Sequence, residues 1–407
     1  MLKVFKPRNW WLAAAVPFVV FLGLEGCQAL SDRLSKWNML ETAALEDPIK
    51  AVGGDGIVFA PPGIDHARDR PHLATLAPNE LVAYYAPIFV QQRINTAAQS
   101  HPYPKEYDEI GEARIRQEDD GKLKAFVAGP PKVYAVYEKR TLSGHDHVQL
   151  TYTAWYPAHP RMKAIDLEAA AIDSCVVRVT LDKDNAPLFY ETIAACGCFH
   201  KVFIERWIEE RASQAYGMPE KNKKYVVERV VKGALDWEVA GLVDEPPESP
   251  RRPVVFLKAG DHKVIGMGSA ARLRVPKEAE SRTYSLAEYS ELYSLPVRPP
   301  LGHQLMVGNP HDRAPFFDME DGGKVYGAQR KERFIFSLIG VDDAGQPRAL
   351  DKIKLHFDQS TWSDPTIYER YLRLPPGVLR LLEKSTDLDQ TPVPTEGLTP
   401  AEPKSNG

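Results

Sequence analysis

Apolar and polar residues alternate along much of the chain from residue 88 onward. In residues 148–156 (VQLTYTAWY), apolar side chains fill every even position, and Gln149, Thr151 and Thr153 fill odd ones. Because successive side chains of a strand point to opposite faces, this run predicts a strand with one buried and one wetter face. Similar runs predict strands at residues 133–137, 176–181, 188–193 and 253–257, with a hairpin turn at residues 182–185.

A helical period replaces this alternation in a few places. It predicts a short helix over residues 80–85, ended by Pro87, and a helix after His200 with Phe203, Ile204 and Trp207 on its buried stripe. A capping-box pattern at residues 285–288 and the sequence 363–365 (SDP) predict two more helix starts. The expected fold class is α+β, mainly antiparallel β with a sandwich-like core and a few flanking helices.

The N-terminus has the layout of a secretory signal. Lys3, Lys6 and Arg8 precede an apolar run over residues 10–24, which is followed by Gly26 and Cys27. This run of about 15 residues is shorter than the roughly 18 to 20 that a spanning helix needs, which disfavours an uncleaved anchor. Gly26-Cys27 resembles the lipobox of bacterial lipoproteins, from which Glu25 departs, and the resemblance implies lipidation of Cys27 ahead of an uncleaved anchor or plain secretion. All three alternatives place the body outside the cytoplasm, in the cell envelope and facing the periplasm.

Changes in composition, chiefly segments rich in Gly, Pro and charged residues, divide the rest of the chain. We expect an anchor at residues 1–27, a tether and entry loop at 28–75, one β-rich domain at 76–385 and a disordered tail at 386–407. The formal net charge is -4 and the body has no basic block, so nucleic acid is excluded as a partner. The expected partner is a membrane, reached through the N-terminal lipid or segment.

The segment 195–200 (ACGCFH) is the main candidate for chemistry. Cys196, Cys198 and His200 could hold zinc if Gly197 bends the chain, because a straight strand would keep the outer two ligands about 13 Å apart. Open alternatives are a disulfide between two of Cys175, Cys196 and Cys198, buried thiols beside an ordinary histidine, and a redox thiol pair.

Further ligands would have to come from elsewhere in the chain. The candidates for a fourth metal ligand are His145, His147, His159 and Cys175, and Asp173 is a candidate base. His145 and His147 begin the strand that His159 follows, so only one of the two ends can lie near Cys198. Asp261 and His262, and the loop residues His303, His311 and Asp312, are weaker candidates for binding.

The order of motifs resembles an uncharacterised group of proteobacterial envelope proteins. The motifs are residues 85–90, 107–111, 153–157, 173–181 and 196–200. Residues 253–262 (PVVFLKAGDH) look more loosely like vacuolar-sorting-related proteins, where the pattern implies a β-rich fold. The chain departs from the bacterial pattern at Ser174 and Val177, where Gly and Trp are favoured, and at Ala194, where a His is favoured. The resemblance implies no established activity.

If the lipobox resemblance of Gly26-Cys27 holds, Gln28 after the cysteine implies an outer-membrane lipoprotein. Two functions remain as hypotheses. The first is an envelope-anchored lipoprotein with a noncatalytic binding or structural role. The alternative is a zinc-dependent hydrolase or other metalloenzyme that uses Cys196, Cys198 and His200.

Overall fold

The computed structural model describes residues 56–62, 73–93, 102–142, 145–162, 166–231, 237–243, 252–270, 273, 280–300, 312–337, 345–355 and 360–378. Cys27, the expected anchor, most of the expected tether and the expected tail lie outside these residues. None of the described helices combines the length and apolar character needed to cross a membrane.

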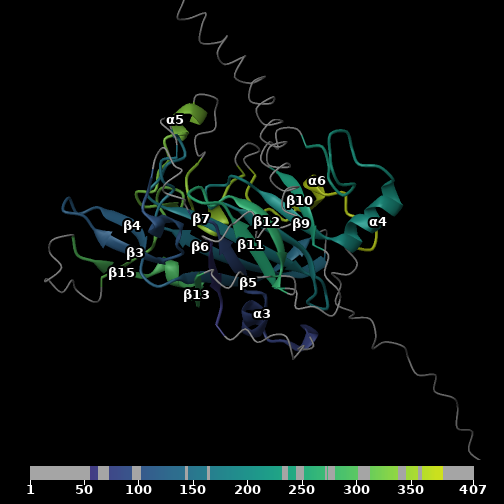
Figure 1. Cartoon of the computed structure of the whole chain (residues 1–407), viewed down its shortest axis with the longest axis horizontal. Coiled ribbons are helices and arrows are strands. Elements are labelled where there is room, and N and C mark those ends of the chain that lie inside the picture. The colour runs from purple at the N-terminus through teal and green to yellow at the C-terminus, as the bar shows by residue number, and fades with distance from the viewer. Residues whose placement is uncertain are drawn as a thin grey trace, which may run out of the picture.

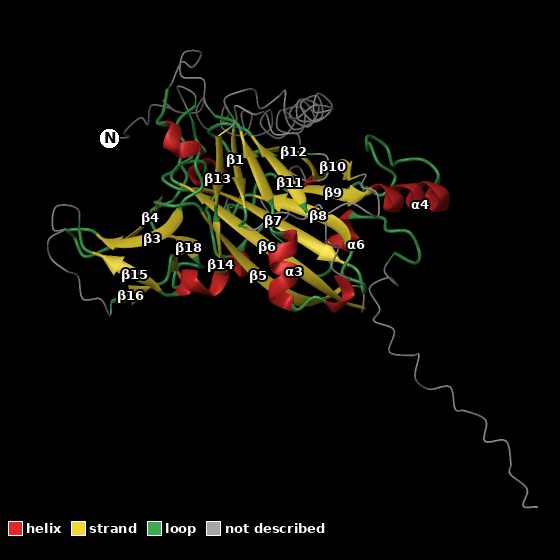
Figure 2. Ribbon diagram, turned by 60° about the horizontal axis from the view of Figure 1, so that its bottom comes forward, coloured by secondary structure: helices red, strands yellow, loops and turns green. Residues whose placement is uncertain are grey.

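A seven-stranded sheet forms the centre of the molecule (Figure 2). Its strands, in spatial order, are β10 (Glu238–Val243), β9 (Lys201–Glu205), β8 (Pro187–Ile193), β7 (Asp173–Leu181), β6 (His145–Tyr156), β5 (Lys132–Leu142) and β14 (Ser285–Glu288). The five strands from β9 to β5 are antiparallel, and the edge strands β10 and β14 add in parallel. The predicted hairpin is confirmed by the antiparallel pairing of β7 with β8.

A second sheet packs on one face of the first. Its strands, in spatial order, are β12 (Val264–Ser269), β11 (Pro253–Leu257), β2 (Ile88–Gln91), β1 (Ile57–Ala60) and β13 (Glu280–Thr283). The core between the two sheets contains Leu150 and Val177 of the first sheet and Phe89 and Val255 of the second. This is the expected sandwich-like α+β fold. Strand β1 is apolar and belongs to this sheet, although it lies within the segment expected to be a tether.

Smaller elements complete the fold (Figure 1). A four-stranded sheet contains β16 (Arg313–Ala314), β15 (Leu295–Arg298), β3 (Glu112–Gln117) and β4 (Leu123–Ala128), and β17 (Phe317–Asp318) pairs with β18 (Lys324–Val325). The helices are α3 (Pro78–Tyr85), α4 (Arg206–Tyr216), α5 (Arg333–Phe336) and α6 (Ile367–Tyr371). The 3-10 helices are η2 (Leu73–Thr75), η4 (Lys105–Asp108), η6 (Tyr289–Tyr293) and η8 (Leu350–Lys352).

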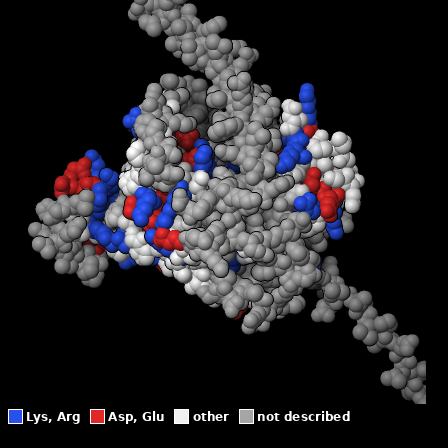
Figure 3. Space-filling model, in the orientation of Figure 1, with Lys and Arg blue, Asp and Glu red and all other residues white. Residues whose placement is uncertain are grey.

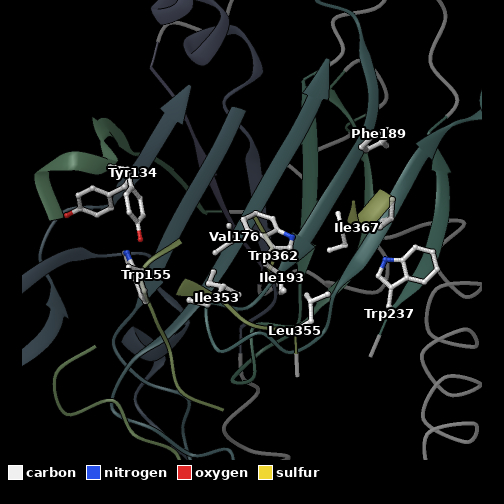
Figure 4. Packing of buried hydrophobic residues seen from close by; sticks show 14 of the residues in the cluster. Tyr134, Trp155, Val176, Phe189, Ile193, Trp237, Ile353, Leu355, Trp362 and Ile367 are labelled. Atoms are coloured by element: carbon white, nitrogen blue, oxygen red, sulfur yellow. The ribbon is translucent and has the colours of Figure 1, made fainter. Parts of the chain in front are cut away.

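The other face of the seven-stranded sheet is also covered, so the expected wetter face of β6 is wrong. Thr151 and Thr153 are buried, and the amide of Gln149 donates to the hydroxyl of Tyr368 in α6 at 2.6 Å. Figure 4 shows Val176 and Ile193 of the sheet beside Ile353, Leu355 and Trp362 of the C-terminal segments. These segments supply the apolar contacts, and Tyr368 gives Gln149 a hydrogen-bond partner that water would otherwise provide.

Two helix predictions are corrected by strand pairing. Lys201–Glu205 is strand β9 and the helix α4 begins only at Arg206. In β9, Phe203 faces the sandwich core and Ile204 the opposite core, as in a central strand buried on both faces. Ser285–Glu288 is likewise strand β14, paired in parallel with β5, and the 3-10 helix η6 follows it.

Candidate functional site

Most of the candidate residues converge at one end of the seven-stranded sheet, where β6 ends, β7 begins and β8 ends. The backbone amide of Ala195 donates to the hydroxyl of Ser174 at 2.8 Å, which fixes the cysteine segment against the start of β7. His159 lies at this end, bonded to Asp173. His147 lies at the far end of β6, where it pairs across the ladder with Arg140. Of the two ends of β6, the end at His159 is therefore the one near the cysteine segment.

Asp173 is the centre of this cluster. Its Oδ2 atom is 3.1 Å from Nδ1 of His159 and 3.0 Å from Nδ1 of His262, and its Oδ1 atom accepts from Nη2 of Arg330 at 2.7 Å. All four side chains are buried. Burial alone would raise the pKa of Asp173, but Arg330 and the two histidines together hold it well below its ordinary value. The carboxylate thus joins the ends of segments far apart in the chain.

The geometry around His262 favours a charged ring. Its Nδ1 atom faces the Asp173 carboxylate at 3.0 Å and its Nε2 atom faces the carbonyl of Tyr107 at 3.0 Å. Both partners are acceptors, so both nitrogens must carry a proton for both bonds to form. Burial lowers the pKa of His262, but the hydrogen bonds to Asp108 and Asp173 outweigh it and raise the pKa to about 9.

Asp108 supplies the second carboxylate of the cluster. It lies 3.6 Å from Nε2 of His262, accepts from the amide of Gly260 at 2.6 Å and accepts from the hydroxyl of Tyr103 at 3.1 Å. The ring of His262 also stacks on Tyr156, with centroids 3.9 Å apart. His262 adopts a left-handed backbone conformation, with φ of 49°, which aims its side chain inward from the turn between β11 and β12.

Cys196 and Cys198 lie side by side next to this cluster. Gly197 has a φ of 86°, so the bend that a shared site requires is present. The two thiols hydrogen-bond to each other, and this contact together with burial raises the pKa of Cys196 well above its ordinary value. Cys175 points instead into the sandwich core, where burial and Asp173 raise the pKa of its thiol.

His200 does not join the two cysteines. Its Nε2 atom is 3.0 Å from Oε1 of Glu191, a fully buried carboxylate that also accepts two hydrogen bonds of 2.7 Å from Arg178. The hydroxyl of Tyr368 donates to the same carboxylate. Burial would raise the pKa of Glu191, but Arg178 and His200 lower it to about 2.

The four candidate ligands Cys175, Cys196, Cys198 and His200 are held in different surroundings. Within the described ranges, no group of three or more His, Cys, Asp or Glu side chains is arranged to hold a metal ion, and Cys175, Cys196 and Cys198 form no disulfide. The physical reason is that His200 is held by Glu191, while Cys175 packs in the sandwich core, which does not include Cys196. Asp173 is also a poor base, because its lowered pKa and three partners leave it little tendency to accept a proton.

A separate pocket of about 240 Å³ lies on the face of the sheet opposite the sandwich core. Its walls come from β5, β6 and β7, from η6 and η8, and from the segment after residue 361: Val136, Glu138, Arg140, Thr151, Arg178, Tyr289, Ser290, Tyr293, Leu350, Asp351, Trp362 and Ser363. Arg178 forms its floor, fixed by Glu191 and by Trp362, whose ring centroid is 3.8 Å from the guanidinium carbon. No sequence motif indicates this pocket, because its residues come from separate segments.

The loop candidates contribute less. His303, His311 and the side chain of His145 lie outside the described residues. Asp312 is exposed, and its carbonyl accepts from the amide of Val297 at 2.9 Å. Asp261 forms a long ion pair with Lys263 at 3.7 Å.

Comparison with known proteins adds no relative: no family model, curated protein or solved structure matches the chain.

Proposed function

We propose that this chain is an envelope protein, tethered to the membrane through Cys27, that binds a small polar ligand without catalysis. The observation that carries the proposal is the pocket above Arg178. Its volume of about 240 Å³ is below the roughly 300–1,000 Å³ typical of pockets for drug-sized ligands, which suits a ligand the size of an amino acid or a monosaccharide.

The charges around the pocket indicate the ligand's chemistry. Arg140 is paired with Glu138 at 2.9 Å and Arg178 with Glu191 at 2.7 Å, so each cation already has its anion. A further carboxylate, Asp351, is half exposed at the rim. A lining that carries both signs favours a zwitterion or a neutral polyol over a multiply charged anion.

The buried clusters support a noncatalytic role. A general base needs a pKa near the working pH, and a thiol nucleophile must ionise. The pKa of Asp173 is lowered, whereas the pKa values of Cys175 and Cys196 are raised. These groups are suited to fixing the ends of loops and strands.

The pocket proposal is tested by filling the pocket from its rim. Ser290 is exposed at the edge, so Ser290→Tyr should fold normally and block the ligand, whereas Ser281→Tyr on the exposed edge strand β13 serves as the matched control. Calorimetry with free amino acids and monosaccharides should find one class that binds in a 1:1 ratio. We expect Ser290→Tyr to weaken it by at least about tenfold, about 1.4 kcal/mol. Equal binding by both variants, or no binding by the wild type, would contradict the proposal.

The tether is tested by fractionation of cells. Cys27→Ala should move the body from the membrane fraction to the soluble periplasmic fraction, because a lipid anchor needs the cysteine sulfur. Retention of the Cys27→Ala variant on the membrane would favour an uncleaved signal anchor instead.

The zinc-dependent hydrolase remains a second candidate. It is favoured by one observation, the two thiols brought together by the bend at Gly197. To complete such a site, His200 would have to leave Glu191 and turn toward the sulfurs.

A further inference from the structure

The turn at Cys196 and Cys198 holds two sulfur atoms together by backbone geometry. The amide of Ala194 donates to the carbonyl of Cys198 at 3.0 Å, and the amide of Gly197 donates to the carbonyl of Ala194 at 2.8 Å. Together with the left-handed Gly197, these bonds close a tight loop whose two thiols are in hydrogen-bonding contact. The cysteines are only 5% and 3% exposed, so water has little access to the sulfurs.

Arg330 provides a second, independent sign of a ligand site beside the sulfurs. Its side chain is 1% exposed, and it interacts electrostatically with both Cys196 and Cys198. Only its Nη2 atom is well paired, with Asp173. Its Nε and Nη1 atoms have no hydrogen-bond partner, and the nearest ion pair of Nη1, with Glu332, is 4.0 Å long.

These two nitrogens call for a strong hydrogen-bond acceptor beside the sulfurs. A neutral thiol is a weak acceptor, so it leaves buried guanidinium N–H groups poorly satisfied. A thiolate is a much stronger acceptor for the same groups, because a charged acceptor strengthens the hydrogen bond. Lys263, which lies 4.1 Å from the ring centroid of Phe199, adds a second cation near Cys198. These two cations favour negative charge on the sulfurs and act against the burial that keeps the pKa of Cys196 raised.

We propose that Cys196 and Cys198 bind one soft monovalent metal ion, Cu(I), between their two thiolates. On binding, each thiol releases its proton to solvent and forms one S–Cu bond, and the copper stays in the same oxidation state. The resulting complex carries one negative charge, which Arg330 faces. Thiolates are the protein ligands that favour Cu(I), whereas structural and catalytic zinc requires at least three protein ligands. The described residues offer no third donor, since His200 is bonded to Glu191.

This inference is independent of the ligand pocket, which lies over Arg178 and contains neither cysteine. Failure of one proposal therefore leaves the other standing.

The test is a competition for copper. The full-length chain with Cys27→Ser, purified in detergent and reduced under anaerobic conditions, is loaded with Cu(I) and dialysed against the chromophoric chelator bicinchoninic acid. We expect one Cu(I) per chain to be withheld from the chelator. Cys196→Ser and Cys198→Ser should each lose it, and Cys175→Ser should keep it. Circular dichroism confirms that each variant is folded.

X-ray absorption on the loaded wild type gives a readout that does not depend on variants. Two sulfur neighbours and no nitrogen would support the site. Complete loss of copper to the chelator, retention by both Cys196→Ser and Cys198→Ser, or a histidine nitrogen in the copper shell would overturn it. A Cys196–Cys198 disulfide that a phosphine reductant cannot open would do so as well.

Discussion

Replacing His262 with glutamine should make the protein less stable at neutral pH and should change the shape of its pH profile. In the wild type the ring lies between Asp173 at 3.0 Å and Asp108 at 3.6 Å, and all three side chains are buried. Glutamine keeps much of the volume but removes the positive charge. It therefore leaves the buried carboxylates with less compensation, a change that typically costs about 3–5 kcal/mol.

The pH dependence follows from the raised pKa. A folded-state pKa of about 9 against an ordinary value of 6.5 corresponds to about 3 kcal/mol of stability, fully present below pH 6.5. At pH 7 most of it remains, and the part already lost reflects the deprotonation of His262 in the unfolded chain. The contribution falls away as the pH rises through 9. The His262→Gln variant has no ring to deprotonate, so it does not show this loss of stability.

Guanidinium unfolding of both proteins at half-unit intervals from pH 6 to pH 10 measures the effect. Buried cysteines and tyrosines also destabilise the fold at alkaline pH, and they do so equally in both proteins. The informative quantity is therefore the difference in unfolding free energy between wild type and His262→Gln. That difference should shrink by about 3 kcal/mol across the range. A difference that stays constant with pH would refute the view that His262 is charged in the fold.

Two further predictions concern the other buried cluster and a tight turn. Glu191→Gln should lower the unfolding free energy by about 3–5 kcal/mol in guanidinium, since Arg178 would keep its charge without a carboxylate. Because the pKa of Glu191 is lowered to about 2, the wild type should also lose stability as the pH falls from 4.5 toward 2, a loss that the variant should lack and that acid titration checks. Gly345→Ala should lower the Tm far more than Gly217→Ala, because both glycines have positive φ but only at Gly345 would a Cβ overlap the buried Glu332 side chain.

The seven-stranded sheet was largely predictable because its strands carry strong local patterns. Residues 148–156 and 176–181 are rich in β-branched and aromatic residues, and the turn between β7 and β8 has the turn-prone sequence DKDN. The sandwich-like α+β class followed from these runs. The burial of the second face of β6 could not be predicted. Its threonines and Gln149 are polar, as on a solvent-facing surface, and only the fold places Tyr368 of α6 against Gln149.

Strand β9 shows how tertiary pairing overrides a local pattern. The spacing of Phe203, Ile204 and Trp207 fits a helical stripe, but Lys201–Glu205 gains ladder bonds on both sides, from β8 and from β10. A central strand is buried on both faces, so all five residues of β9 are buried, and the same apolar residues that suggested a helical stripe fit this strand.

The nearly balanced charge of the sequence agrees with the intermixed acidic and basic side chains visible in Figure 3.

The candidate site was only partly predictable for a similar reason. The sequence singled out Asp173, His159 and His262 separately, and Cys196 with Cys198 as a pair. It gave no indication that one carboxylate bonds both histidines, because Asp173 and His262 are 89 residues apart. Arg330 was missed altogether, since it lies in a loop with no recognisable motif, 157 residues from Asp173.

The measurement that most directly separates ligand binding from zinc catalysis is the zinc content of the full-length chain, purified from the cell envelope without chelator. The account predicts no stoichiometric zinc, because His200 is held by Glu191 and the described residues contain no group of three metal-binding side chains. One zinc per chain, lost in Cys198→Ser and in His200→Ala while both variants remain folded, would contradict it and make the hydrolase the better reading.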